Sequence, residues 1–360
     1  MFAYYLLVGA PLLLALLLYG MKRTYRLEKV PYQSKILGLF FLICFCLLAF
    51  RASNIGSDTS NYLSQFYVAR NMSWRDYLRE KSSEIGFTVL TKLISEISGS
   101  GQFYLAIIAF LSVYPLAKLY REESESPILT ISLYLILPMF AMQFSGLRQA
   151  VAMAFVPLAY SYVKTKRWGR FLAVVLIATL FHKSAWLILL LYPTYHINIS
   201  RKALLWAIPA LFLVYMFNEQ IYVGLIAIAN NLYSDRYAET TETGAYSMLF
   251  LFAIILFFSY LFLGDTDVET KGQRNILFLS VAIQCFALVN RVAMRMNYYF
   301  LLFLPLLLPK VIRRIPYKNK WFASMVEIVC CAYFLYYFMD KMLSGQSAFG
   351  IYPYIPFWKG

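Results

Sequence analysis

Apolar runs long enough to cross a membrane recur along the whole chain, with short polar segments between them. One crossing needs about 20 mainly apolar residues, and these runs are solid rather than alternating. The pattern therefore predicts an all-α polytopic membrane protein and excludes a β-barrel. We expect about twelve spans, at residues 2–20, 35–50, 102–120, 127–145, 148–163, 170–181, 184–195, 203–217, 245–264, 275–290, 297–312 and 321–340.

Two of these runs, 170–181 and 184–195, are too short to cross a membrane upright. They flank the sequence FHKS, which contains His182 and Lys183. We expect either one broken helix or a tight hairpin of two passes here. Interrupted spans persist where the backbone is buried in protein or lines a wet cavity, so they indicate a functional site.

Composition and charge agree with a membrane protein and set its orientation. Of the 360 residues, 61% are hydrophobic and only 14% are charged, too few for an ordinary soluble domain. The densest basic segments fall on one face of the twelve-span scheme, together with REESES (121–126) and DTDVETKGQR (265–274), and we assign that face to the cytoplasm. These basic segments are MKRTYRLEK, KTKRWGR (164–170), ISRK and PKVIRRIPYKNK. This bias accounts for much of the net charge of +15 without a nucleic-acid partner. Both termini then lie outside, and we expect no cleavable signal peptide.

The opposite face carries the long polar segments, at about 51–101 and 218–244, and the first includes an amphipathic stretch at 86–98. We find no internal repeat and treat residues 1–360 as one integral-membrane domain. Five cysteines in apolar segments and two histidines give no disulfide framework or metal cluster. The acidic DTD at 265–267 stands in a short charged loop, so we expect neither a metal nor a cofactor.

Arginines at the ends of apolar runs form the first candidate site. Arg148, in FSGLRQAVAMAF, has no acidic residue within twenty positions. It either snorkels from a helix end or faces a cavity that binds an anion. Arg291 and Arg295 share a helical face and repel each other unless an anion bridges them. Guanidinium groups suit phosphate, and Arg51 stands at a similar boundary.

Three further residues could carry proton chemistry. His182 can take a proton from a hydroxyl, although a lone histidine among apolar residues is more often only hydrogen-bonded. Asp58 suits a helix N-cap, with Tyr62 one turn later, and could instead bind sugar hydroxyls. Glu84, before the amphipathic stretch, has the same two interpretations. Together with the arginines, these residues favour a lipid ligand that carries phosphate and glycan.

The motifs RASNIGSDTSNY, EIGFTVL, GLRQAVAMAF, FHKSAWL, YSDRY and NRVAMRMNYYFLLFLP occur here in this order. The set resembles the EpsG family, the Wzy-type polymerases of bacterial O-antigen and exopolysaccharide. The resemblance covers Arg51 to about Pro305. Ser57 replaces the threonine that the family usually has before the aspartate of the first motif, a change that leaves Asp58 in place.

The resemblance implies a metal-independent membrane glycosyltransferase of the bacterial cytoplasmic (inner) membrane, with its active site facing outward. Such polymerases are similar to other membrane-embedded, lipid-linked glycosyltransferases. They transfer a glycan from undecaprenyl pyrophosphate onto a lipid-linked repeat unit. The implied partners are the lipid-linked donor and acceptor and membrane lipid, with a chain-length regulator as a further candidate and no nucleic acid.

On this basis the candidate residues receive roles. The base would be His182, with Asp58 and Glu84 as the next choices. The pyrophosphate would be bound by Arg148, Arg291, Arg295 and Arg51, because charge grows on it as the glycosidic bond breaks. The glycan would be bound by Tyr62, Arg236, Tyr237 and Gln149.

Two other functions remain open. A flippase or exporter of lipid-linked oligosaccharide would share the spans and the ligand, but its cations should line a path through the membrane. Here the candidate arginines gather on one face, which favours an enzyme. An acyltransferase that decorates polysaccharide would need a more prominent histidine constellation than the one histidine predicted here.

Overall fold

The computed structural model describes residues 2–25, 32–80, 84–199, 201–229, 246–264, 267–315, 320–345 and 349–359. Within these ranges the chain is helical, apart from one isolated antiparallel bridge between Arg51 and Pro356. Contacts divide it into two compact units, and each is described by itself. Unit 1 comprises Met1–Ile188 and Ser324–Gly360, and unit 2 comprises Leu189–Ala323.

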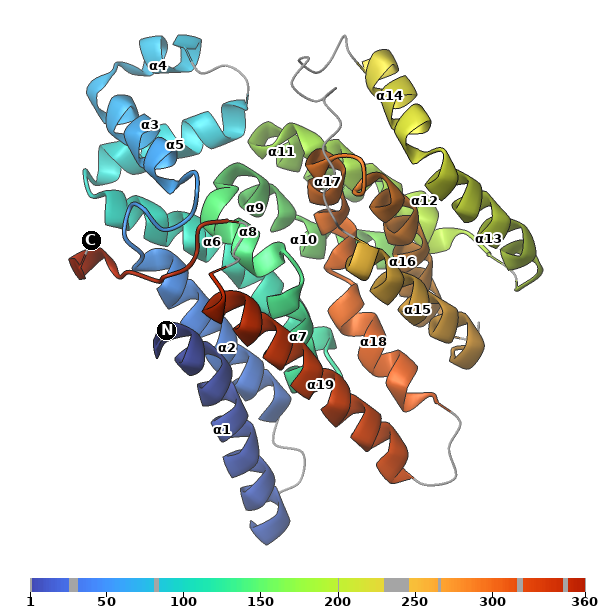
Figure 1. Cartoon of the computed structure of the whole chain (residues 1–360). Coiled ribbons are helices and arrows are strands. Elements are labelled where there is room, and N and C mark those ends of the chain that lie inside the picture. The colour runs from blue at the N-terminus through green and yellow to red at the C-terminus, as the bar shows by residue number, and fades with distance from the viewer. Residues whose placement is uncertain are drawn as a thin grey trace. The chain divides into compact units, whose positions relative to one another are not determined.

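Unit 1 is built on long apolar helices (Figure 1). Helix α2 packs against α1 and α6. The helices of this unit are α1 (Phe2–Tyr25), α2 (Tyr32–Ala49), α3 (Thr59–Asn71), α4 (Trp74–Glu80), α5 (Ile85–Ile97), α6 (Gly101–Glu123), α7 (Pro127–Ile136), α8 (Met139–Ser145), α9 (Leu147–Met153), α10 (Val156–Lys164), α11 (Trp168–Phe181), the 3-10 helix η1 (Lys183–Leu190), most of α19 (Lys320–Leu343), and the 3-10 turn η3 (Phe357–Lys359).

Unit 2 is centred on α16, which packs against α12, α13, α14, α15, α17 and α18. Gly272 allows the contact with α12, because a Cβ there would stand 2.2 Å from the ring of Tyr195. The helices of this unit are α12 (Leu191–His196), α13 (Arg201–Met216), α14 (Asn218–Ala229), α15 (Tyr246–Phe262), α16 (Val268–Phe286), α17 (Arg291–Leu301) and α18 (Leu304–Arg313).

The described residues contain four helices that are long and apolar enough to span a membrane, or up to six if two bent pairs each count as one span. The chain is thus a helical membrane protein, as predicted, but the expected twelve spans are not confirmed. The four are confirmed at Phe2–Tyr19, Tyr32–Ala49, Gly101–Glu123 and Trp321–Leu343.

Helix breaks divide several of the predicted runs into shorter helices. Leu137 precedes Pro138 and is extended, so α7 ends there and α8 continues at an angle of 51°. Pro305 stands in the first turn of α18, which follows α17 with a bend of 56°. The run predicted at 148–163 is divided into α9 and α10, and the run at 184–195 is η1 followed by α12.

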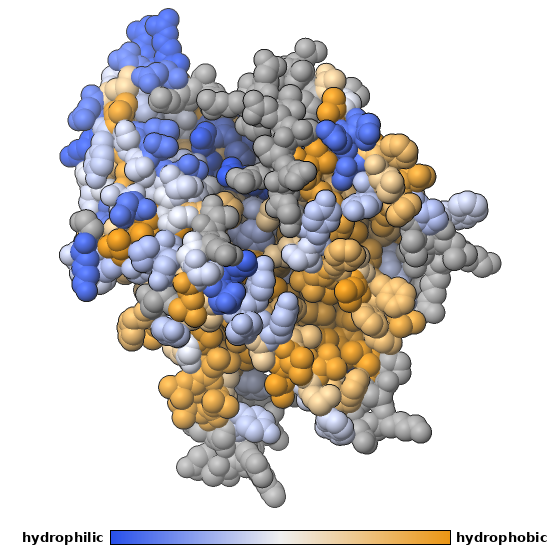
Figure 2. Space-filling view, in the orientation of Figure 1, coloured by the Kyte–Doolittle hydropathy of each residue, from blue (hydrophilic) through white to orange (hydrophobic). Residues whose placement is uncertain are grey.

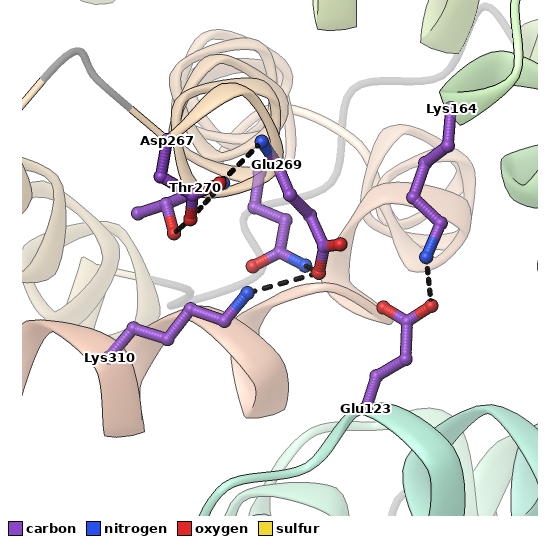
Figure 3. A network of polar contacts seen from close by, with 7 residues as sticks. Glu123, Lys164, Asp267, Glu269, Thr270 and Lys310 are labelled. Carbon is purple, nitrogen blue, oxygen red and sulfur yellow. Dashed lines mark hydrogen bonds and ion pairs between the residues drawn. The ribbon is translucent and has the colours of Figure 1, made fainter.

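One end of unit 1 joins the segments that the sequence assigns to the cytoplasm. Arg121 Nε donates to Ser34 Oγ over 2.9 Å, which places the end of α6 beside the start of α2. Lys164 forms an ion pair with Glu123 (Figure 3), so the segments REESES and KTKRWGR also meet. These contacts confirm that REESES and KTKRWGR lie at the same end of unit 1, beside the start of α2.

The other end of unit 1 holds the polar segment 51–101. The Gln102 side chain bonds the Ala49 carbonyl, so α3, α4 and α5 form a cap between the ends of α2 and α6. Figure 2 shows hydrophilic residues over α3 and α4 and hydrophobic residues over α1 and α2. Part of the C-terminal tail lies on this cap, since Ser57 N donates to Phe349 O over 3.0 Å.

Candidate active site

A buried carboxylate joins three segments of unit 1 that are far apart in sequence. Glu84 Oε2 accepts a bond from Arg148 Nη1 over 2.6 Å. Its other oxygen, Oε1, lies 2.6 Å from His182 Nδ1 and accepts from the backbone N–H of Lys183 over 3.2 Å. The cluster therefore brings together residues from EIGF, GLRQ and FHKS, three of the motifs that sequence analysis identified.

The backbone at Glu84 and His182 is shaped for this contact. Glu84 precedes the first residue of α5, and His182 is the extended residue at which α11 stops. Gly86 lets the two helices approach closely, because a Cβ there would stand 3.0 Å from the backbone carbonyl of Leu180. The interruption predicted within FHKS is thus confirmed, and it turns the imidazole toward the carboxylate.

Arg148 reaches the cluster from a second helix break. Helix α8 ends and α9 begins at Gly146, which places Arg148 in the first turn of α9. Its Nε donates to the Tyr62 hydroxyl over 3.3 Å, and its guanidinium carbon lies 5.7 Å from the centre of the Tyr62 ring. Within the described residues, the remaining nitrogen, Nη2, has no partner. With 38% of the side chain exposed, one edge of the guanidinium stays open to a ligand.

The absence of a nearby acid in sequence suggested that Arg148 is unpaired, and the structure corrects this. Its partner Glu84 is 64 positions away along the chain. Burial raises the pKa of Glu84, but the hydrogen bond and charge of His182, together with Arg148 and the Lys183 N–H, bring it below its ordinary value. Burial lowers the pKa of Arg148, but the larger combined effect of Tyr62 and Glu84 raises it above its ordinary value. The pair is thus fully ionised near neutral pH.

The ionised carboxylate fixes the state of the histidine. A carboxylate only accepts hydrogen bonds, so His182 Nδ1 must carry the proton that it shares with Glu84. The other ring nitrogen, Nε2, is then an acceptor in the neutral imidazole, and it has no partner among the described residues. With 30% of the side chain exposed, this nitrogen can take a proton from an incoming group.

The turn at 51–59 stands beside this cluster as a separate, well-bonded element. Thr59 Oγ1 and Arg51 Nη2 donate to the Phe144 carbonyl, over 3.0 and 3.1 Å. Gly56, with φ of +91°, is needed there because a Cβ would stand 2.3 Å from the same oxygen. The turn thus bonds the end of α8 at Phe144, two residues before the break at Gly146 that places Arg148.

Two residues predicted to bind substrate are buried. Arg51 is 1% exposed and also donates to the Leu48 carbonyl over 2.8 Å. Burial lowers the pKa of Arg51 to about 10, against smaller opposing effects of Tyr354 and Tyr104. The side chain of Gln149 is 4% exposed. Their roles stay predictions.

Asp58 occupies the predicted position before α3, but its side chain forms no capping bond to that helix. Its carboxylate is half-buried and has no hydrogen-bond or ion-pair partner within the part of the chain that the structure describes. Tyr62, one turn later as predicted, bonds Arg148 instead.

The other predicted residues lie outside this cluster. Arg291 and Arg295 are both on α17 of unit 2, where Arg295 is exposed. The side chain of Arg291 is not among those described, and Arg236 and Tyr237 lie outside the described residues. Their proposed contacts with pyrophosphate and glycan stay predictions.

Asp267, the last residue of the DTD segment, is a helix cap in unit 2 (Figure 3). Its carboxylate accepts from the backbone N–H groups of Glu269 and Thr270, over 3.1 and 3.2 Å. Burial raises the pKa of Asp267, but these bonds and Thr270 Oγ1 hold it below its ordinary value. Within the described residues no group of three or more His, Cys, Asp or Glu side chains could hold a metal ion.

Sequence reasoning selected Glu84, Arg148 and His182 separately and missed that they form one cluster. The pairing depends on long-range packing, since the partners are 64 and 98 positions apart along the chain. Gly86 was the available signal, since a glycine two positions after a carboxylate indicates a close approach. The contact of the C-terminal tail with the turn at 51–59, through Ser57 and Phe349, had no signal in the sequence.

A family model matches most of this chain. The model, described as the EpsG family, covers residues 35–355. No curated protein matches. No solved structure matches either. The family match includes all segments of the Glu84 cluster and indicates a role in polysaccharide polymerisation. By sequence, therefore, the chain belongs to the EpsG family.

Proposed function

We propose that the protein is a Wzy-type polymerase of the bacterial cytoplasmic membrane. It transfers a glycan from undecaprenyl pyrophosphate onto a lipid-linked repeat unit at the outer face. The observation that carries this proposal is the Glu84 carboxylate, which holds a partly exposed arginine and a partly exposed histidine side by side. Family membership supports the polymer product, and the positive-inside rule supports the outer face.

His182 acts as the base in this proposal. The acceptor hydroxyl gives its proton to Nε2, and its oxygen forms the new bond to the anomeric carbon of the donor. Glu84 is a positioning residue, since it fixes the tautomer and stabilises the imidazolium that forms. The geometry of the cluster supports different roles for His182 and Glu84, which sequence analysis treated as alternative bases. Asp58 remains the other candidate, as a carboxylate that binds sugar hydroxyls.

Arg148 stabilises the leaving group. As the bond from the anomeric carbon to the pyrophosphate oxygen breaks, the electron pair stays on that oxygen. A fixed guanidinium near the growing charge is most effective in a partly dry site. The open Nη2 edge supplies the contact, while Nε and Nη1 hold the group on Tyr62 and Glu84. Arg291, Arg295 and Arg51 remain proposed further contacts, and Arg236, Tyr237 and Gln149 proposed glycan contacts.

The test uses a deletion strain that is complemented with variants. Arg148→Ala, His182→Ala and His182→Gln should each abolish long-chain polysaccharide while the protein remains inserted and folded. Single repeat units on lipid should then accumulate at the outer face. Normal polymer from Arg148→Ala would refute the role in the leaving group. Retained activity in His182→Gln would reduce the histidine to a hydrogen-bonding residue.

The same strain separates the polymerase from its alternatives. Repeat units trapped on the cytoplasmic face would identify a flippase. Full-length polymer that lacks a substituent would identify a decorating acyltransferase. Each result can be read from the lipid-linked intermediates and the polysaccharide of a single deletion.

A further inference from the structure

A polar groove on α3 is not used by the proposed reaction. It has a volume of about 680 Å³, within the range of ~300–1,000 Å³ that is usual for small-molecule sites. Its polar side chains are those of Ser53, Ser60, Ser64, Tyr67 and Asn71. All of them belong to unit 1 and to the polar cap between α2 and α6.

Helix geometry aligns the groove with α3 and separates it from the catalytic cluster. Ser60, Ser64, Tyr67 and Asn71 are four, three and four positions apart, so they share one face of the helix. At 1.5 Å per residue this face extends over about 16 Å. Tyr62, two positions after Ser60, lies on nearly the opposite face, where it bonds Arg148.

The hydroxyl groups in the groove do not bond their own helix. Elsewhere in unit 1, the side chains of Ser95, Ser112 and Ser132 each donate to the carbonyl three positions earlier. Ser60 and Ser64 form no such bond, and no other described residue is their partner. Both hydroxyls can therefore donate to and accept from a ligand.

Tyr67 adds an aromatic surface that is held in place. Its side chain is 46% exposed, and its ring meets the edge of Phe66 at a centroid distance of 5.4 Å. Its hydroxyl lies close over Gly101, where an added Cβ would be only 2.6 Å away. Asn71, one turn further, contributes an amide that has no partner among the described residues.

The end of α3 is also fixed. Lys92, 2% exposed, donates from Nζ to the carbonyls of Ala69 and Met72, over 2.8 and 2.9 Å. Arg70 Nη1 donates to the Ser95 carbonyl over 3.1 Å. The groove thus stands on a helix tied to α5, which lowers the ordering cost of binding.

This chemistry selects the ligand class. No charged side chain lines the groove, which disfavours pyrophosphate. Leu63, Val68 and Met72 also line it, but the row of hydroxyl and amide groups among them disfavours a lipid tail. Neutral hydrogen-bonding groups beside an exposed tyrosine ring suit a polyhydroxylated ring with an apolar face. We propose that the groove binds an uncharged stretch of carbohydrate, away from the reacting atoms. That this carbohydrate is the enzyme's own glycan rests on the proposed polymerase function.

The test measures binding and polymer length separately. The probe is a lipid-free oligosaccharide released from the host strain's own polysaccharide, and saturation-transfer NMR follows its binding to the protein in lipid nanodiscs. Ser64→Trp, which fills the middle of the groove, should weaken binding about 10-fold, as expected for the loss of one or two neutral hydrogen bonds. In cells it should shift the polysaccharide to shorter chains.

Two further variants guard against trivial results. Tyr67→Ala removes the ring and should weaken binding in the same direction if Ser64→Trp does not fold. Arg79→Trp places the same bulky side chain on an exposed position of α4, outside the groove, and should bind and polymerise as the wild type does.

The outcomes distinguish this inference from the proposed function. Wild-type oligosaccharide binding and wild-type polysaccharide length in Ser64→Trp would overturn the proposal that the groove binds carbohydrate. If the wild-type protein binds the oligosaccharide but makes no polymer, and Ser64→Trp loses this binding, the groove is supported and the polymerase function is refuted. Ser64→Trp could also bind the oligosaccharide as the wild type does and shorten the polysaccharide only when a second membrane protein is present. That result would mean that the groove binds the second protein, and it would overturn the proposal.

Discussion

Replacing Glu84 by glutamine tests the centre of the proposed site. The two side chains have nearly the same shape, but a carboxamide presents one acceptor oxygen and one donor nitrogen. If the nitrogen faces Arg148, that 2.6 Å contact is lost, and if it faces His182, Nδ1 must become the acceptor and the ring proton must move to Nε2. Arg148 then keeps its charge without its acidic partner.

The size of the effect on stability follows from these contacts. A hydrogen bond to a charged group contributes about 1.5–3 kcal/mol to stability. Arg148 and His182 are 38% and 30% exposed, so water replaces part of what is lost. We therefore expect Glu84→Gln to lower the free energy of unfolding by about 1–2 kcal/mol.

The effect on activity should be much larger. Without the carboxylate, neither the tautomer of His182 nor its imidazolium form is stabilised, and general-base catalysis contributes about 10²–10⁴-fold to a rate. We expect the polymerisation rate to fall by about this factor. The assay follows lipid-linked repeat units converted to polymer by purified protein in nanodiscs, and thermal unfolding of the same samples gives the stability.

Glu96→Gln is the matched control on the same helix. Glu96 also pairs with a cation, Lys92, but it is 52% exposed, so its loss should cost less than about 1 kcal/mol. Its polymerisation rate should stay at the wild-type level. A Glu84→Gln protein with near wild-type activity would refute the role of Glu84 in positioning His182.

Three further predictions follow from the same geometry. Gly86→Ala should lower the free energy of unfolding by about 1–3 kcal/mol and reduce polymer yield, because the added Cβ meets the Leu180 backbone. Gly169→Ala on α11, with nothing within 4 Å of the added Cβ, should be neutral or stabilising. Equal unfolding temperatures of the two variants would contradict this prediction. Arg148→Lys should lose most activity in the nanodisc assay, since an ammonium cannot replace the three contacts of Nε, Nη1 and Nη2 of the guanidinium. An active variant would show that these three contacts are not needed together. Because the pKa of Glu84 is below its ordinary 4.5, its contribution to stability is fully present above about pH 4.5 and is lost as the pH falls through the lowered pKa. The difference in stability between the wild type and Glu84→Gln, measured by thermal unfolding, should therefore disappear at acid pH. A difference that does not depend on pH would exclude the ionised pair.

The sequence by itself determined the class of the protein and the segments that matter. Solid apolar runs require helices in a membrane, because only a closed set of backbone hydrogen bonds survives there. The order of the apolar runs placed REESES and KTKRWGR on one side, and the Lys164–Glu123 ion pair shows that these two segments meet. Local rules also placed the start of α3 after Asp58 and the interruption at His182.

Only the tertiary structure decided how these segments meet. Hydropathy counts apolar residues and cannot see that Leu137 and Pro138 break the run at 127–145, or that the run at 148–163 is divided into α9 and α10. It also cannot pair charges that lie 64 positions apart, which left Arg148 without its acid. The pairing exists because α5 and α9 pack over α11 and α6 and bring their first residues to one point. Packing, and not local preference, thus turned three separate candidates into one site.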